Sequence, residues 1–228
     1  MSCSVTLKNL SYGNGGNKLC KNINLNITHK EKIAIIGPNG CGKTTLLDII
    51  AGLKQKQSGV LELFHNVIEE EKDFKDIRNL IGYLIQNSDN QFLAPTVLDD
   101  VAFSLFSSGM NKNEAIIKAT IMLKDLNIEH LKNKIVYNLS GGEKKLIALA
   151  GVLVTEPKLM LLDEPTNGLD YKMQLKLVKI LQEVDKSIII VSHHREFIDS
   201  IVDKVYEITP NGLILIANHS IQTEPHIH

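Results

Sequence analysis

The chain has 228 residues, 43% of them hydrophobic, and its 25 Lys and Arg nearly balance its 26 Asp and Glu. This length suits one large domain with a substantial core, and the apolar fraction is too high for a disordered chain. The net charge of −1 lacks the basic excess of a dedicated nucleic-acid binder, so we expect no nucleic-acid partner. No apolar run approaches the roughly 20 residues that span a bilayer, so we expect no membrane-spanning segment.

The cysteines Cys3, Cys20 and Cys41 are odd in number and include no Cys-x-x-Cys pair. They therefore indicate neither a disulfide framework nor a zinc site, and we expect a reducing compartment. The first residues lack a basic segment followed by an apolar stretch, so we expect no secretory signal.

The N-terminal part of the chain is predicted to form strands. Residues 4–10 and 21–28 alternate between apolar and polar side chains, which is typical of a half-exposed antiparallel sheet. Residues 32–36 are apolar on both faces, which predicts a strand buried in a sheet that helices cover. This strand runs into Gly37 and then into an apolar helix at 44–51.

Short apolar strands and helices alternate again near the C-terminus. Strands are predicted at 159–162, 188–191 and 205–208, and the clearest helix lies at 173–184. Strands that alternate with helices predict an α/β fold with a mainly parallel core sheet.

The middle of the chain shows only helical spacing, at 113–126 and 144–154, which predicts an all-helical insertion. We therefore expect one domain in three parts. They are a core of residues 1–87 and 156–218, which includes the antiparallel sheet, a helical subdomain of residues 88–155, and a polar tail of residues 219–228.

Residues 37–44, Gly-Pro-Asn-Gly-Cys-Gly-Lys-Thr, fit the P-loop pattern Gly-x-x-x-x-Gly-Lys-[Ser/Thr]. The glycines let backbone N–H groups converge on phosphate oxygens, and the following helix adds the positive end of its dipole. Lys43 is expected to reach the β- and γ-phosphates of ATP, and Thr44 to bind Mg²⁺. An accidental glycine-rich turn is the alternative, but the buried strand before it and the helix after it favour the P-loop. The expected nucleotide contacts are Gly37, Pro38, Asn39, Gly40, Cys41, Gly42, Lys43, Thr44 and Thr45.

Residues 159–165, Leu-Met-Leu-Leu-Asp-Glu-Pro, place two carboxylates at the end of an apolar strand. Such a strand end can hold Mg²⁺ in the crevice where open α/β sheets bind ligands. We expect Asp163 to be the metal carboxylate and Glu164 to polarise the water that attacks the γ-phosphate. Two acids at a strand end are more often simply solvated, but the P-loop earlier in the chain favours the catalytic interpretation.

Residues 139–142, Leu-Ser-Gly-Gly, precede a helical pattern. Ser140 is a good N-cap, and Gly141 and Gly142 leave backbone N–H groups open to an anion. Alone this is only a helix cap. Together with the preceding motifs, however, it makes nearly the whole chain resemble the ATP-binding cassette (ABC) ATPases, whose signature these residues match. The resemblance implies the P-loop NTPase fold of that family, with a mainly parallel core sheet, an N-terminal antiparallel β subdomain and an all-helical insertion, and it implies ATP hydrolysis.

The resemblance implies further residues around the nucleotide. Tyr12 matches the aromatic residue that stacks on adenine. Gln86, at the end of a predicted strand at 80–86, matches the glutamine that senses Mg²⁺ and the attacking water. The implied Mg²⁺ ligands are Thr44, Gln86 and Asp163.

Two more positions follow from the resemblance. Asp170 matches the loop that crosses the dimer interface of the family. His193 matches the switch histidine that contacts the γ-phosphate, and the neighbouring His194 is the alternative.

In the family, ATP is held between the P-loop of one subunit and the signature of the other. Lys43 and Ser140 would therefore act on one nucleotide only across a homodimer, or a heterodimer with a second ABC ATPase. The chain departs from the family pattern at Glu143, usually Gln, and at Leu146, commonly Arg. The first departure adds negative charge beside a phosphate site, so the dimer is expected to close more weakly.

Residues 86–97 and 99–103 resemble the ATPases of energy-coupling factor transporters, which import cobalt, nickel or vitamins. The resemblance implies a peripheral protein on the cytoplasmic face of the cell (inner) membrane, with a transmembrane coupling subunit and a substrate-binding membrane subunit as partners. In this branch the region borders a groove that receives a helix of the coupling subunit. The candidate groove residues are Phe92, Leu93, Pro95 and Val97, and packing into the core is the alternative for each.

Other functions stay open at this point. A soluble ABC ATPase that acts on nucleic acid or ribosomes would be expected to have a basic face, tandem cassettes or a long coiled-coil insertion. A regulatory nucleotide switch would normally lose the carboxylate that Glu164 provides. A subunit of another ABC transporter class is a further alternative. The transported solute is not encoded in this chain, although its moderate length weakly favours a dedicated homodimeric cobalt, nickel or biotin system.

Overall fold

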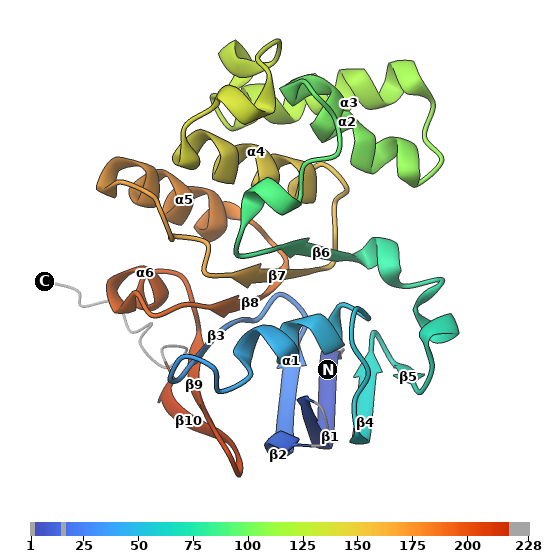
Figure 1. Cartoon of the computed structure of the whole chain (residues 1–228), viewed down its shortest axis with the longest axis vertical. Helices are drawn as coiled ribbons and strands as arrows, with labels where there is room; N and C mark the ends of the chain where they lie inside the picture. The colour runs from blue at the N-terminus through green and yellow to red at the C-terminus, as the bar shows by residue number, and fades with distance from the viewer. Residues whose placement is uncertain (1–2, 15–16, 219–228) are drawn as a thin grey trace, which may run out of the picture. The chain divides into compact units, whose positions relative to one another are not determined.

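The computed structural model describes residues 3–14 and 17–218 (Figure 1). The chain divides into two compact units. The first unit comprises Met1–Arg78 and Asp185–His228, and the second comprises Asn79–Val184. The polar tail expected at residues 219–228 lies outside the described residues.

The first unit contains an antiparallel sheet with the strand order β2-β1-β4-β5. Its strands are β1 (Cys3–Asn14), β2 (Asn17–Thr28), β4 (Ser58–Leu63) and β5 (Asn66–Ile68). The alternation in β2 works as predicted, because Ile23, Leu25 and Ile27 are buried while Asn24 and Asn26 between them are exposed. The antiparallel N-terminal sheet is thus confirmed, and β4 and β5 are additions that the sequence pattern did not predict.

The strands that this unit contributes to the second sheet follow the order β10-β9-β3-β8. They are β3 (Lys32–Ile36), β8 (Ser187–Val191), β9 (Lys204–Thr209) and β10 (Gly212–Asn218), and the helices of the unit are α1 (Lys43–Ile50) and α6 (Arg195–Asp199). Strand β3 pairs in parallel with both β8 and β9, whereas β10 is antiparallel to β9. Ile33, Ala34 and Ile35 are fully buried, as their two-sided apolar pattern predicted.

The second unit pairs two parallel strands and carries the long helices of the middle region. The strands are β6 (Ile81–Leu84) and β7 (Leu159–Asp163), and the helices are α2 (Val97–Ser107), α3 (Lys112–Asp125), α4 (Gly141–Leu153) and α5 (Tyr171–Glu183). Residues 85–158, all of which are described, contain no strand beyond one isolated bridge between Thr96 and Ile135. The helical insertion is therefore confirmed.

One predicted element end is wrong in a way that concerns the site. The strand predicted at 80–86 ends at Leu84, so Gln86 lies in the segment after the strand. Helix α4 begins at Gly141 with Ser140 as its N-cap, as the sequence predicted.

Short 3-10 helices connect these elements. They are η1 (Glu71–Phe74), η2 (Arg78–Leu80), η3 (Ser88–Asn90), η4 (Glu129–Leu131) and η5 (Val136–Asn138). Within residues 3–14 and 17–218, no helix combines the length and the apolar character that crossing a bilayer requires.

Candidate nucleotide site

The P-loop connects the end of β3 to the first residue of α1 and is folded around one lysine. Lys43 is 8% exposed, and its Nζ donates hydrogen bonds to the backbone oxygens of Gly37 (2.8 Å) and Pro38 (2.9 Å). An ammonium group has three N–H donors, so two of them close the loop in this state. Thus Lys43 also shapes the loop in which it is expected to bind phosphate.

The glycines of the P-loop fit a phosphate cradle. Gly37, Gly40 and Gly42 all have positive φ, at 150°, 76° and 101°. A Cβ at Gly37 would lie 2.6 Å from Cγ2 of Ile208, whereas a Cβ at Gly40 would meet nothing within 4 Å. Gly37 is therefore needed for close packing, and Gly40 leaves open space above the backbone.

Tyr12 supports the P-loop from beneath. Its side chain has no exposed surface, and its hydroxyl donates to the Gly42 carbonyl oxygen at 3.1 Å. Burial raises the pKa of this phenol far above its ordinary value, with Cys20 as a smaller cause, so the hydroxyl stays protonated as a donor. Stacking on adenine needs an exposed ring face, which Tyr12 does not have in this structure.

The outer side of the P-loop is accessible. Pro38, Asn39, Gly40 and Thr44 are exposed, and Cys41 and Thr45 are partly exposed. The Cys41 Sγ lies 4.0 Å from the Lys43 Nζ. The loop therefore presents its middle residues and Thr44 to solvent at the start of α1.

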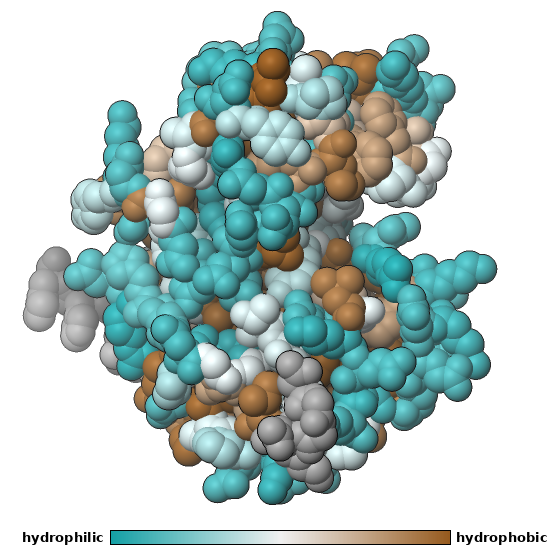
Figure 2. Space-filling model, viewed as in Figure 1, coloured by the Kyte–Doolittle hydropathy of each residue, from teal (hydrophilic) through white to brown (hydrophobic). Residues whose placement is uncertain are grey.

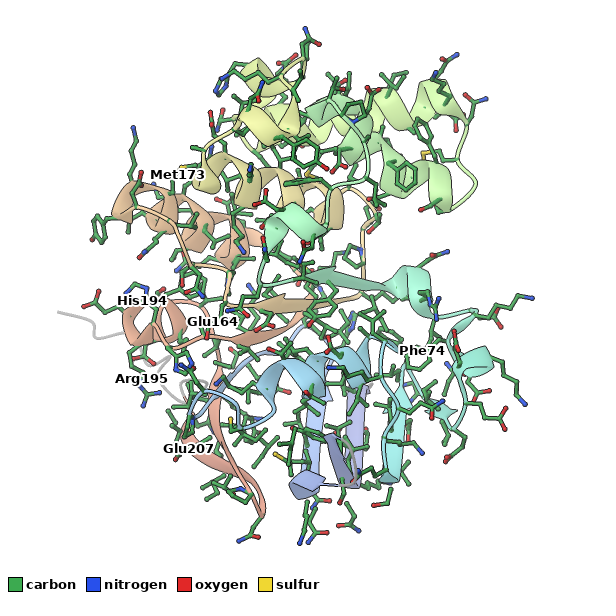
Figure 3. All side chains as sticks on the ribbon, viewed as in Figure 1. Phe74, Glu164, Met173, His194, Arg195 and Glu207 are labelled. Carbon is green, nitrogen blue, oxygen red and sulfur yellow. The ribbon has the colours of Figure 1, made fainter. Side chains whose placement is uncertain are left out.

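Asp163 and Glu164 stand at the end of β7, where the sequence pattern places them (Figure 3 labels Glu164). They are only 1% and 7% exposed, which is unusual for carboxylates. Glu164 has a φ of 45°, a left-handed conformation that few non-glycine residues adopt. Such conformations concentrate at functional sites, where the surrounding fold enforces them.

Gln86 is exposed, and its backbone carbonyl oxygen accepts a hydrogen bond of 2.8 Å from Lys145 Nζ. Lys145, in α4, is 3% exposed. Burial lowers the pKa of the Lys145 ammonium, and attraction to Asp163 and Glu164 opposes that shift. The sequence pattern gave no reason to single out Lys145, because a lysine in a polar helix start is normally solvated.

The signature residues form the first turn of α4. Ser140 is the N-cap, and its Oγ accepts from the Glu143 N–H at 3.3 Å. The Glu143 carboxylate reaches back, accepting from the Ser140 N–H (2.8 Å) and from the Ser140 hydroxyl (2.9 Å). This reciprocal arrangement is a capping box. The bond from the Ser140 backbone is the main reason that the pKa of Glu143 is lowered.

Glu143→Gln is expected to strengthen ATP-driven dimerisation several-fold. The Ser140 hydroxyl now donates to a carboxylate, which competes with any phosphate for the same hydrogen, and the amide is a weaker acceptor without the charge. The measurement is the ATP concentration for half-maximal dimerisation by analytical ultracentrifugation, with Glu129→Gln, at a partly exposed carboxylate, as control. Equal concentrations for Glu143→Gln and the unaltered chain would show that the carboxylate does not compete.

The same substitution is expected to remove a pH-dependent part of the stability. Because the folded-state pKa of Glu143 is lowered, its charged cap stabilises the fold above the unfolded pKa of roughly 4.3 and is lost as pH falls through the folded value. Capping interactions contribute about 1 kcal/mol, so at neutral pH the substitution is expected to lower the free energy of unfolding by only about that amount.

Asp170 and the two histidines have distinct surroundings. Asp170 is the N-cap of α5, and its Oδ1 accepts from the Met173 N–H at 2.8 Å. His194 stacks on Phe197 of α6, with ring centroids 6.5 Å apart, whereas His193 is exposed (Figure 3 labels His194). The stacking engages His194 in packing and supports the choice of His193 as the residue that meets the nucleotide.

The predicted site residues thus divide between the two units. The first unit holds Tyr12, the P-loop and His193, and the second holds the rest. Within the second unit, Lys145 Nζ contacts the Gln86 carbonyl oxygen, and the charges of Asp163 and Glu164 raise the pKa of the Lys145 ammonium against the effect of burial.

Known proteins resemble this chain along nearly all of its length. The ABC transporter family model matches residues 20–167. Over 228 residues the chain is 40% identical to a putative ABC transporter ATP-binding protein of Brucella suis, covering 98% of this chain and 95% of that protein. It is 34% identical over 215 residues to the energy-coupling factor transporter ATP-binding protein EcfA of Methanothermobacter thermautotrophicus, covering 92% of this chain and 69% of that protein.

Solved structures share the fold. The structure of cbiO1 from Clostridium perfringens, part of the ABC transporter complex cbiONQ, gives a TM-score of 0.84 at 34% identity and covers 96% of this chain and 90% of that one. The ATP-binding cassette MJ0796, solved as a dimer in a post-hydrolysis state with ADP and Pi, gives 0.83 at 27% identity and covers 94% and 98%. Since the family model spans more than half of the chain and a relative is 40% identical across nearly all of it, the chain belongs to the ABC transporter ATP-binding proteins and is an ATPase of that family.

Proposed function

We propose that this ATPase is the motor subunit of an importer of the energy-coupling factor type, which takes up a transition-metal ion such as cobalt or nickel, or a vitamin such as biotin. The observation that carries the proposal is the joint similarity to cbiO1 and EcfA over at least nine-tenths of the chain. It agrees with the resemblance of residues 86–97 to that branch.

The segment after Gln86 holds the apolar residue Leu93 in an exposed position. The Asp100 carboxylate is 8% exposed and accepts from the N–H groups of Leu93 (2.7 Å) and Ala94 (2.9 Å). This fixes the loop while the Leu93 side chain remains 71% exposed. Burial raises the pKa of Asp100, and the two N–H bonds oppose that shift.

Only two of the four candidate groove residues are exposed. Phe92 and Val97 are buried at 6% and 0% exposure, so their side chains pack into the core instead of lining a groove. Leu93 and Pro95 are exposed. Figure 2 shows apolar surface over α2 and α3, whose exposed apolar residues include Phe103, Ile117 and Ile121. We propose that Leu93 and this surface contact the membrane-embedded coupling subunit.

We propose that two copies, or one copy and a second ABC ATPase, bind ATP between the P-loop of one and Ser140 of the other. Thr44, Asp163 and Gln86 would hold Mg²⁺, which neutralises charge that develops on the phosphates. Glu164 accepts a proton from the attacking water, and His193 and Lys43 contact the γ-phosphate. Loss of the γ-phosphate removes contacts that hold the closed dimer, so hydrolysis reopens it.

Pull-down from a detergent extract of cells tests the transporter assignment. We propose that the chain lies on the cytoplasmic side of the membrane. We expect an energy-coupling factor membrane subunit to co-purify with the tagged chain. Leu93→Asp is expected to reduce that capture at least tenfold, because a charge at a buried interface is costly to desolvate. Leu175→Asp, at another exposed leucine, is the matched control.

Other outcomes separate the alternatives. Recovery of ribosomes or nucleic acid, without a membrane subunit, would favour the soluble ABC ATPase. Recovery of membrane subunits of another class would place the chain in a different ABC transporter type.

A further inference from the structure

A buried lysine connects the signature helix to the segment that carries Gln86. Lys145 belongs to the second turn of α4 and is 3% exposed, and its Nζ lies 2.8 Å from the Gln86 carbonyl oxygen. Lysine is almost never buried to this extent unless it is paired. The contact crosses from one chain segment to another, so it fixes their relative position.

The charge of Lys145 has its counterpart at the end of β7. Asp163 and Glu164 both attract the Lys145 ammonium and thereby oppose the effect of its burial. Two neighbouring buried carboxylates repel each other, and a cation close to both reduces that repulsion. The Lys145 side chain therefore interacts with three of the expected site residues: with Asp163 and Glu164 through charge, and with Gln86 through a hydrogen bond to its backbone.

The preceding residue, Lys144, makes a more exposed contact with the same segment. Lys144 forms an ion pair of 2.7 Å with Asp89, whose side chain is 51% exposed. Partly exposed ion pairs of this kind contribute much less to stability than buried ones. Both lysines tie α4 to the segment after β6, but only Lys145 is buried and close to the carboxylates. Lys144 is thus a matched control in the same helix turn.

We propose that Lys145 is a positioning residue for ATP hydrolysis: it holds the backbone of Gln86 beside Asp163 and Glu164 and so couples the signature helix to the Gln86 segment. The proposal rests on the proposed role of Gln86 in the reaction. A shift of α4 on nucleotide binding at Ser140 is passed through Lys145 to Gln86. In this proposal Lys145 itself does not contact the nucleotide phosphates, which bind the P-loop, Ser140 and His193.

The first test measures the position of the Gln86 segment without any nucleotide. Hydrogen–deuterium exchange of amides at 85–91 is expected to rise at least tenfold in Lys145→Met, because the segment loses its anchor. Lys144→Met is expected to leave these amides within about twofold of the unaltered chain, since it removes only a partly exposed ion pair. Unchanged exchange in Lys145→Met would overturn the anchoring role. If that variant fails to fold, Lys145→Gln takes its place: its shorter, uncharged side chain is also expected to raise exchange at 85–91, and unchanged exchange would again overturn the anchoring role.

The second test separates Lys145 from Gln86 in catalysis. Lys145→Met is expected to lower kcat roughly tenfold with KM for ATP nearly unchanged, because misplacement of a positioned group lowers the rate of the chemical step. In a Gln86→Ala background the same substitution is expected to change kcat less than about twofold, because the group being positioned is gone. A full tenfold effect in that background would overturn positioning through Gln86. If Gln86→Ala alone leaves kcat unaltered, the proposed role of Gln86 fails, and the exchange result still decides whether Lys145 holds the segment.

Discussion

Glu164→Gln is expected to lower the rate of ATP hydrolysis by roughly 10²–10⁴-fold, the usual contribution of a general base. Gln is nearly isosteric with Glu but cannot take the proton of the attacking water. The backbone at Glu164 is left-handed and the side chain is buried, so the fold holds this residue in one place at the end of β7. Loss of the charge therefore removes chemistry and leaves the position of the group unchanged.

ATP binding is expected to persist in this variant, and the ATP-bound dimer is expected to accumulate because hydrolysis no longer reopens it. Phosphate release measures the rate, and size-exclusion chromatography with light scattering measures the dimer. Glu183→Gln, at the exposed end of α5, is the matched control for removal of one carboxylate. Hydrolysis within tenfold of the unaltered rate would mean that another group takes the proton.

Sequence patterns were most informative where burial and backbone geometry are local. The two-sided apolar run of β3, the alternation of β2 and the glycines of the P-loop each encode their own structure, since a P-loop needs positive φ at set positions. β4 and β5 were missed for the opposite reason. Their pattern is short and only partly buried, and β4 depends on a distant contact, where a Cβ at Gly59 would lie 2.3 Å from the Asn9 carbonyl oxygen.

The sequence predicts which residues belong to the site better than it predicts how buried they are and what they contact. The spacing that relates Tyr12 to the P-loop cannot show that its ring is fully buried beneath Gly42. Lys145 is the reverse case, because a charged residue in a helix is normally solvated and only the tertiary fold brings two carboxylates to it. Glu143 lies between these cases. The Ser-x-x-Glu spacing of a capping box is present in the sequence. The departure from the family pattern predicted only the added negative charge of Glu143, whereas the structure shows that its carboxylate also caps α4.

Lys43→Met is expected to weaken ATP binding about 10–100-fold, the range for one charge-assisted hydrogen bond, and to abolish measurable hydrolysis. Met has a similar length and volume but no charge and no donor. The Lys43 Nζ also donates to the Gly37 and Pro38 carbonyl oxygens, so the variant loses the bonds that hold the loop closed before ATP arrives. Part of the lost affinity therefore reflects a less preorganised loop, which binding must order.

These two contributions can be separated by measuring the loop without nucleotide and the affinity for ATP in parallel. Lys54→Met removes an exposed lysine that pairs with Asp48 at 2.9 Å and is the matched control. Amide exchange of residues 37–42 without nucleotide is expected to increase in Lys43→Met and to stay unchanged in Lys54→Met, while titration with fluorescent ATP measures affinity. Faster exchange with unaltered affinity would show that Lys43 serves the loop and not the phosphates, because a residue that binds phosphate directly must weaken affinity when its charge is removed.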